Sequence, residues 1–249
     1  MSSVQKSVGG LFKSGWRTLM QNKILIVLGI VFGLLSESAS VTEEVSGGLG
    51  LILLVLGLIG FIGTIGVHGA IHITHMNRLT NTTVNVTSRV FSRLLSLIGI
   101  FILYIISVVI GLLLFIIPGI YVGLKLYPSF AICVMEDKGV INSINTSWNY
   151  TSGNLLTILG LFIVLVTLQI ASIVLAALIA IPSLFAGSFG VLPAGVVGLV
   201  AILLLAILEL TIEGSIADFV LEAQDISDHV SNNNTDTTND TPDEYSVEF

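Results

Sequence analysis

Long apolar stretches without charge dominate the pattern along this chain. No Asp, Glu, Lys or Arg occurs in 45–77, 94–124 or 139–208. A buried helix of a soluble protein seldom needs more than about 14 apolar residues, whereas a helix that crosses a bilayer needs roughly 20. The pattern therefore predicts a polytopic, all-α membrane protein built as a bundle of transmembrane helices.

The composition agrees with this class. Apolar residues make up 54% of the 249 residues, charged residues only 10%, and the mean hydropathy is +1.00. Soluble globular domains contain about 25% charged residues. The single cysteine, Cys133, excludes an internal disulfide and a cysteine-based metal cluster.

The apolar runs and their charged borders predict how often the chain crosses the membrane. Two runs are marginal: the first is short, and the fourth contains Lys125 and Pro128. With six spans, eight of the nine basic residues fall on one side, whereas four spans divide them six to three. The positive-inside rule favours six spans, with both termini in the cytoplasm of a multi-pass cell-membrane protein. The expected spans lie near 22–38, 48–73, 94–117, 119–135, 154–181 and 195–220.

The N-terminal region allows two interpretations. Its short apolar run, followed by Ser38-Ala39-Ser40, has the features of a cleaved signal peptide. Against cleavage, apolar residues recur at helical spacing through 4–20, with basic residues between them, as in a helix that lies in the membrane surface. The segment 140–152 has a similar pattern, and we expect a surface helix in both places.

The chain resembles three copies of one unit. Asn22 and Asn154 each open an apolar helix six residues after a tryptophan, and the segment 93–101 parallels 154–162. Each unit reads as a surface segment, an outgoing helix, a turn and a returning helix. The sequence therefore predicts three helical hairpins.

The composition changes at Glu222. From there to the C-terminus the chain contains eight acidic residues and no lysine or arginine. Such a segment lacks the apolar content to order itself. We expect an integral membrane domain over 1–221 and a disordered acidic cytoplasmic tail over 222–249.

The second apolar run carries glycines and histidines at regular spacing. Glycine recurs at every third position from Gly57 to Gly69, which favours close packing of a neighbouring helix, or else a substrate groove. His68 and His72 lie four residues apart on one helical face and could share a zinc ion. The glutamate of the corresponding metalloprotease motif is missing, so the alternative is a pair of polar residues at the headgroup boundary.

Three charged residues inside the expected spans are the other candidates. Glu209 and Glu213 lie four apart in the last span, and Lys125 lies in the fourth. Ionisable groups in the hydrocarbon normally face a partner or a cavity. We expect a Lys125–Glu209 pair that fixes packing, with snorkelling to the interface or a transport site as alternatives.

One segment resembles a known family. It contains Pro118-Gly119, then Lys125, Pro128, Glu136, Ser147-Trp148 and Gly153-Asn154. This stretch resembles the membrane domain of some glycerophosphoryl diester phosphodiesterases and of related bacterial and archaeal six-span proteins. The resemblance is good over 118–154 and loose elsewhere. It implies a six-span topology but no activity, because no soluble phosphodiesterase domain is present in these residues.

Three hypotheses for the function follow. No nucleophile elbow, phosphate-binding loop or dinucleotide fingerprint is found, so we predict no enzyme activity and no cofactor. The favoured hypothesis is a non-enzymatic membrane module that organises lipid or protein partners, including a second copy of itself, but not nucleic acid. The alternatives are a small-solute or ion transporter that uses Lys125, Glu209 and Glu213, and a metal-dependent membrane enzyme that uses His68 and His72.

Overall fold

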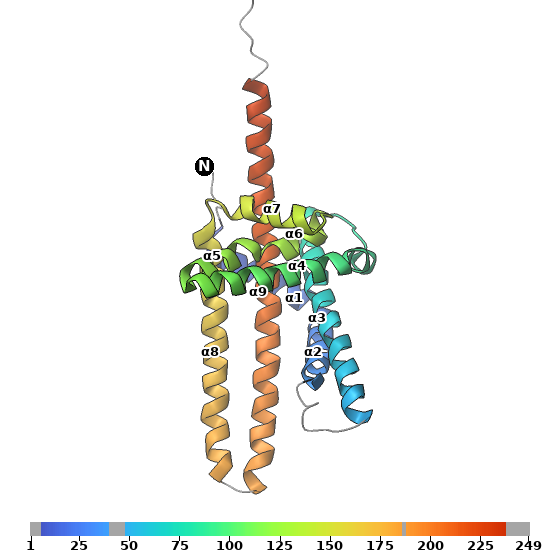
Figure 1. Ribbon diagram of the computed structural model, residues 1–249, viewed down its shortest axis with the longest axis vertical. Coiled ribbons are helices and arrows are strands. Elements are labelled where there is room, and N and C mark those ends of the chain that lie inside the picture. Colours follow the sequence, from blue (N-terminus) through green and yellow to red (C-terminus); the bar gives the residue numbers. More distant parts are fainter. Residues whose placement is uncertain (1–5, 40–47, 186–187, 238–249) are drawn as a thin grey trace, which may run out of the picture.

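A computed structural model describes residues 6–39, 48–185 and 188–237 (Figure 1). These residues form helices with short connections and contain no strand, which confirms the predicted all-α class. The helices are α1 (Val8–Gln21), α2 (Lys23–Glu37), α3 (Gly48–Thr80), α4 (Val86–Leu114), α5 (Ile116–Leu126), α6 (Ser129–Met135), α7 (Val140–Thr151), α8 (Leu155–Phe185) and α9 (Ser188–Thr237).

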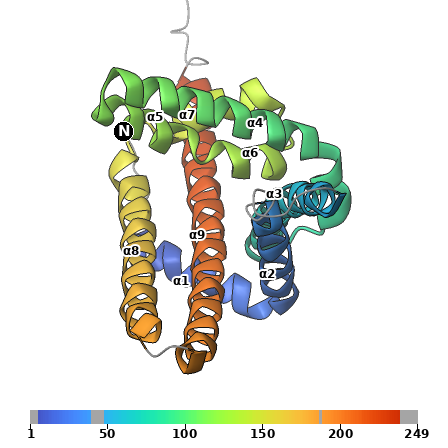
Figure 2. The ribbon, with the colours of Figure 1, turned by 60° about the horizontal axis from the view of Figure 1, so that its bottom comes forward.

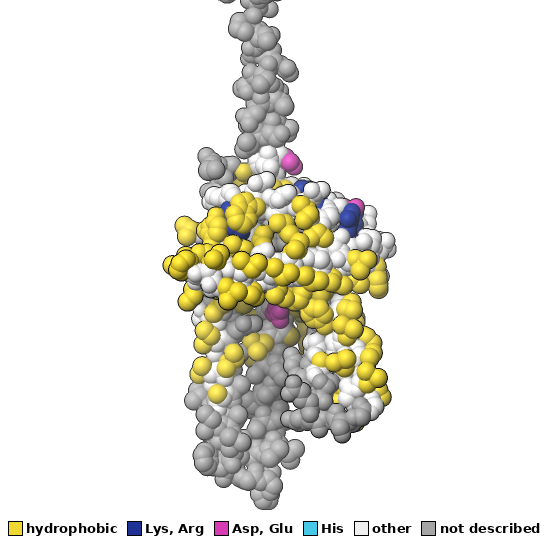
Figure 3. All heavy atoms as spheres, viewed as in Figure 1, with side chains coloured by type: hydrophobic (Ala, Val, Ile, Leu, Met, Phe, Trp, Pro, Cys, Tyr) yellow, Lys and Arg dark blue, Asp and Glu magenta, His cyan; other side chains and the backbone are white. Residues whose placement is uncertain are grey.

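The predicted hairpins are recognisable as α2 with α3, α4 with α5, and α8 with α9, because each pair packs together. They are not parallel to one another. Figures 1 and 2 show that α4 and α5 run across the direction of α8 and α9. In Figure 3, hydrophobic side chains cover much of the visible face of this crossing band.

Several helices are long and apolar enough to cross a membrane, so the membrane class holds. Among the described residues these are Gly48–Thr80, Val86–Leu114 and Ile116–Met135, and the total rises to five if each of two bent helix pairs is one span. The predicted number of six spans is larger than these three to five candidates and stays a prediction.

The two bent pairs are the places where surface helices were expected. α1 meets the start of α2 at 90°, and α7 meets the start of α8 at 102°. Both amphipathic segments are helical, as predicted, and Ser7 caps α1 by accepting a hydrogen bond from the Gly10 amide. In the middle unit α4 is one continuous helix from Val86, so this copy lacks a separate surface helix.

The first three glycines of the series in α3 serve close packing against α2, whereas Gly66 and Gly69 face side chains of α4. A Cβ added at Gly57 would meet Ala39, and one added at Gly60 or Gly63 would overlap the backbone near Ser36 or the ring of Phe32. Absence of side chains at these positions lets the two helices approach closely. This outcome agrees with the packing interpretation of the series.

The predicted boundary at Glu222 is wrong in part, because α9 continues as a helix to Thr237. Phe219, Val220 and Ala223 are buried against the core, and the Lys6 amide donates a hydrogen bond to Glu222. The acidic segment therefore begins within a packed helix and does not start as a disordered tail. Residues 238–249 of the predicted tail lie outside the described residues.

An ionic contact fixes the start of α4 to the connection between α6 and α7. Asp137 Oδ1 lies 2.6 Å from Arg93 Nε and 2.9 Å from Arg89 Nη1. The hydrogen bond from Arg93 lowers the pKa of Asp137 below its ordinary value. This contact joins the basic start of α4 to the connection between α6 and α7, two segments that the six-span prediction places on the same side.

Candidate functional site

Three histidines of α3 face three carboxylates of α9 across a helix–helix contact. We call this set the His–carboxylate seam, and it consists of His68, His72, His75, Glu209, Glu213 and Asp218. Spacings of three and four residues place the histidines along one side of α3. His72, His75, Glu213 and Asp218 are buried, whereas Glu209 is exposed.

Glu213 is the centre of the first part of the seam. Its Oε1 lies 3.5 Å from His68 Nδ1, and its Oε2 lies 3.2 Å from His72 Nε2. The Tyr127 hydroxyl donates a 2.8 Å hydrogen bond to Oε1. Neither ring nitrogen of His72 makes a hydrogen bond among the described residues, so the short approach to Glu213 is electrostatic and poorly aligned.

Asp218 is the centre of the second part. Lys6 Nζ donates a 2.7 Å hydrogen bond to Asp218 Oδ1, and His75 Nε2 lies 3.8 Å from the same oxygen. On its other side, His75 Nδ1 is hydrogen-bonded to Thr18 Oγ1 of α1 at 2.7 Å. The second part of the seam therefore ends at Lys6, whose side chain is half exposed.

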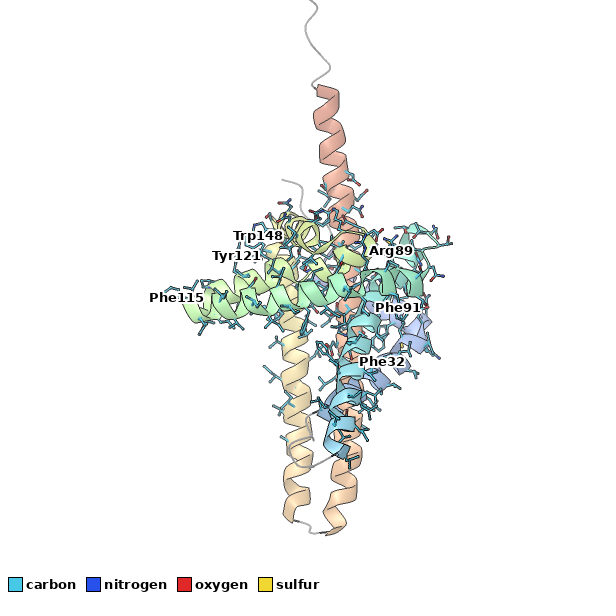
Figure 4. All side chains as sticks on the ribbon, turned by 45° about the vertical axis from the view of Figure 1, so that its right-hand side comes forward. Phe32, Arg89, Phe91, Phe115, Tyr121 and Trp148 are labelled. Atoms are coloured by element: carbon cyan, nitrogen blue, oxygen red, sulfur yellow. The ribbon has the colours of Figure 1, made fainter. Side chains whose placement is uncertain are left out.

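Lys125 lies apart from the seam, contrary to the expected pair. Its Nζ donates to Ser152 Oγ at 2.7 Å and to the Trp148 carbonyl at 3.3 Å. The ammonium also lies 5.3 Å from the Trp148 ring centre and 5.7 Å from that of Tyr121, two residues labelled in Figure 4. No ion pair joins Lys125 to a carboxylate within the described part of the chain.

This location gives a testable expectation for the Lys125–Glu209 pair. Lys125→Met should cost about 1 kcal/mol of stability by removing the bond to Ser152. Adding Glu209→Gln should not rescue the loss, and the two effects should add within about 0.5 kcal/mol. Thermal unfolding of the single and double variants in detergent measures this coupling. If Glu209→Gln partly rescued the stability of Lys125→Met, Lys125 and Glu209 would be an ion pair after all, and the expectation would be wrong.

Two apolar cavities meet at the exposed end of the seam. One, of about 380 Å³, lies among α4, α5, α8 and α9, and the other, of about 260 Å³, lies among α3, α4, α6 and α9. Tyr104, Tyr127 and Glu209 line both cavities, while His68 and Glu213 line only the second. Leu, Ile and Phe side chains supply most of the remaining walls.

Glu209 is the carboxylate that these cavities share. Its side chain is 49% exposed, and its nearest basic neighbour is His68, whose Nε2 is 3.9 Å from Oε1. The distance is too long for a hydrogen bond, so the contact leaves the carboxylate able to accept from a ligand. Glu213, by contrast, is already engaged by Tyr127 and by two imidazoles.

The seam does not form a metal centre. Among the described side chains, no group of three or more His, Cys, Asp or Glu residues is arranged to hold a metal ion. His68 and His72, the candidates for zinc, instead approach the two oxygens of Glu213. The arrangement can exchange protons between imidazole and carboxylate, or bind a basic group at Glu209.

The sequence pointed to His68, His72, Glu209 and Glu213, and the structure brings these four together. It missed His75 and Asp218 of the seam and Lys6, the partner of Asp218. It also missed Tyr127 and Thr18, which are ordinary residues in apolar or amphipathic segments. Pro128 is the signal that could have located Tyr127, because a proline between α5 and α6 interrupts the helix directly after this residue.

Comparison with protein-family models, with curated proteins and with solved structures finds no match to this chain, so the chemistry of the site rests on its own residues.

Proposed function

We propose that this protein is a non-enzymatic membrane module that binds an amphiphilic ligand carrying a basic nitrogen. The observation that supports this is the position of Glu209, an exposed carboxylate on the wall of both apolar cavities. An alkyl chain would occupy one cavity, and the basic head would pair with Glu209.

The size and lining of the cavities fit such a ligand. Sites for small molecules commonly have volumes of about 300–1,000 Å³ and combine apolar walls with a few polar groups. Here the two cavities hold about 380 and 260 Å³, and Tyr104, Tyr127 and Glu209 are their shared polar groups. A cationic head would be attracted to the carboxylate, and to the faces of the two tyrosine rings.

We place the end of the molecule that carries α1, α7 and the start of α4 in the cytoplasm. The expected basic cytoplasmic segments support this orientation, as do the sharp bends where α1 and α7 meet the apolar helices. In this orientation the protein would have six spans, as the resemblance to the phosphodiesterase membrane domain implies.

Binding of matched amphiphiles tests the proposal. The full chain in nonionic detergent is titrated with dodecylamine, dodecanol and dodecanoate, which differ only in the head group. We expect the amine to bind most tightly and Glu209→Gln to weaken its binding by about tenfold, because a charge-assisted hydrogen bond is lost.

Asp228→Asn is the matched control, because it removes one negative charge from an exposed position of α9, about 28 Å along the helix from Glu209. It should leave the affinity for the amine unchanged. Equal affinity for dodecylamine and dodecanol, or equal losses in the two variants, would contradict the proposal.

Transport is the second candidate, and the seam is the observation that favours it. Imidazole and carboxylate groups lie along α3 and α9 in two contacting sets, one from Glu209 to Glu213 through His68, and one from His75 to Asp218 and the half-exposed Lys6. In proteoliposomes with a pH dye inside, transport coupled to protons would produce an internal pH change on addition of the amine. If the internal pH change equalled that of protein-free liposomes, transport would be excluded and only the proposal of ligand binding would stand.

A further inference from the structure

A cluster of three basic side chains lies outside the His–carboxylate seam. Lys13 and Arg17 lie four residues apart on the exposed side of α1, and Arg78 comes from the last turn of α3. Together with Ser14 and Gln21 they line an open pocket of about 440 Å³. We call this the basic pocket, and its charge is opposite to that of the Glu209 cavities.

Arg78 is held in place within this pocket. Its Nη2 donates to the carbonyl oxygen of Ser14 at 3.2 Å and to Ser14 Oγ at 3.1 Å. Its Nε is buried and makes no hydrogen bond among the described residues. A guanidinium has five N–H donors, so a fixed Arg78 retains donors for an anion.

The positive charge of the pocket is not balanced within the described part of the chain. No ion pair there joins a carboxylate to Lys13, Arg17 or Arg78. Asp218, whose field reaches Arg78, is hydrogen-bonded to Lys6. The C-terminal dipole of α3 accounts for a cation at Arg78 but not for the two cations that α1 adds beside it.

We propose that the basic pocket binds a phosphate group, carried by an anionic lipid or by a soluble phosphate ester. Arg78 would supply directed hydrogen bonds to the phosphate oxygens, while Lys13 and Arg17 would supply charge and Gln21 a further donor. Since α1 has the pattern of a surface helix, this pocket would lie at the depth of the lipid head groups. The site is independent of the ligand proposed for Glu209.

Three probes distinguish the source of the phosphate. The full chain in nonionic detergent is titrated with dihexanoyl phosphatidylglycerol, dihexanoylglycerol and glycerol 1-phosphate. Binding of the phospholipid alone assigns the site to a lipid head group, and binding of both phosphates assigns it to the phosphate itself. Absence of binding by both, or equal binding of dihexanoylglycerol, would overturn the proposal.

Variants tie the binding to the pocket. Arg17→Gln changes an exposed residue and should retain the fold, while Arg78→Gln removes the positioned guanidinium. Each should weaken binding of the phosphate probe by about tenfold. Arg78→Lys keeps the charge but not the planar donor group, so its affinity should lie between those of Arg78→Gln and the unchanged protein. Lys138→Gln removes one positive charge from the connection between α6 and α7 and should change the affinity less than about twofold. Equal losses in all variants would mean unspecific attraction and would refute the site.

Discussion

Gly15→Val is expected to separate α1 from α9 and to produce the largest loss of stability of any single change in α1. A Cβ at Gly15 would overlap the carbonyl oxygen of Thr211 and lie 2.7 Å from the amide nitrogen of Ser215. On the other helix, a Cβ at Gly214 would lie 2.9 Å from Gly15 Cα. The two backbones are thus in contact, and neither can move away without losing the packing of Leu11.

The expected cost is about 3 kcal/mol, the upper part of the usual range for overpacking, because backbone rather than a flexible side chain occupies the space. Thermal unfolding of the purified protein in detergent measures it. Gly9→Val is the matched control, since a Cβ built there has no atom within 4 Å apart from its chain neighbours and the adjoining helix backbone. Equal unfolding temperatures for the two variants would show that the helices do not touch at Gly15.

Glu213→Ala should be at least as damaging, for an electrostatic reason. Glu213 is buried. Its Oε1 accepts the Tyr127 hydrogen bond and lies near His68, and its Oε2 lies near His72. Removing one partner of a buried charged network typically costs about 3–5 kcal/mol, because the remaining polar groups lose their partner without regaining water. We therefore expect a large fall in the unfolding temperature of Glu213→Ala.

Glu213→Gln should cost roughly half as much, because the amide oxygen still accepts the Tyr127 hydrogen bond. Glu209→Gln is the control on the same helix. Its side chain is 49% exposed, so its change in stability should stay below about 1 kcal/mol. If the alanine variant were as stable as the unchanged protein, the network around this carboxylate would contribute nothing.

The sequence predicted helices and their positions well, because long apolar runs and amphipathic spacing are local properties. The helices α1 and α7 follow from such spacing. Spacing along one helix also identified His68 with His72 and Glu209 with Glu213. The sequence could not show which helices face each other. It therefore could not show that the histidine pair of α3 meets the glutamate pair of α9.

The Lys125 prediction failed for a related reason. Counting residues along each span assumes that all helices run parallel to one membrane axis. α5 instead runs across α8 and α9 (Figure 1), and α7 brings Ser152 and the Trp148 carbonyl to the ammonium. The tail boundary was misplaced because composition alone does not record that Phe219, Val220 and Ala223 pack against the core.

The contact of α1 with α9 has a consequence for the order of synthesis on the ribosome. α1 is made early, but the surface that receives Gly15, together with the Asp218 that pairs with Lys6, is made more than 190 residues later. Until α9 is made, α1 can contact α3 through the Thr18–His75 and Arg78–Ser14 bonds, but the face of α1 that contains Gly15 lacks its final partner. Lipid or an insertion factor must shield it until α9 emerges, so closure of this contact belongs to the last stage of biogenesis.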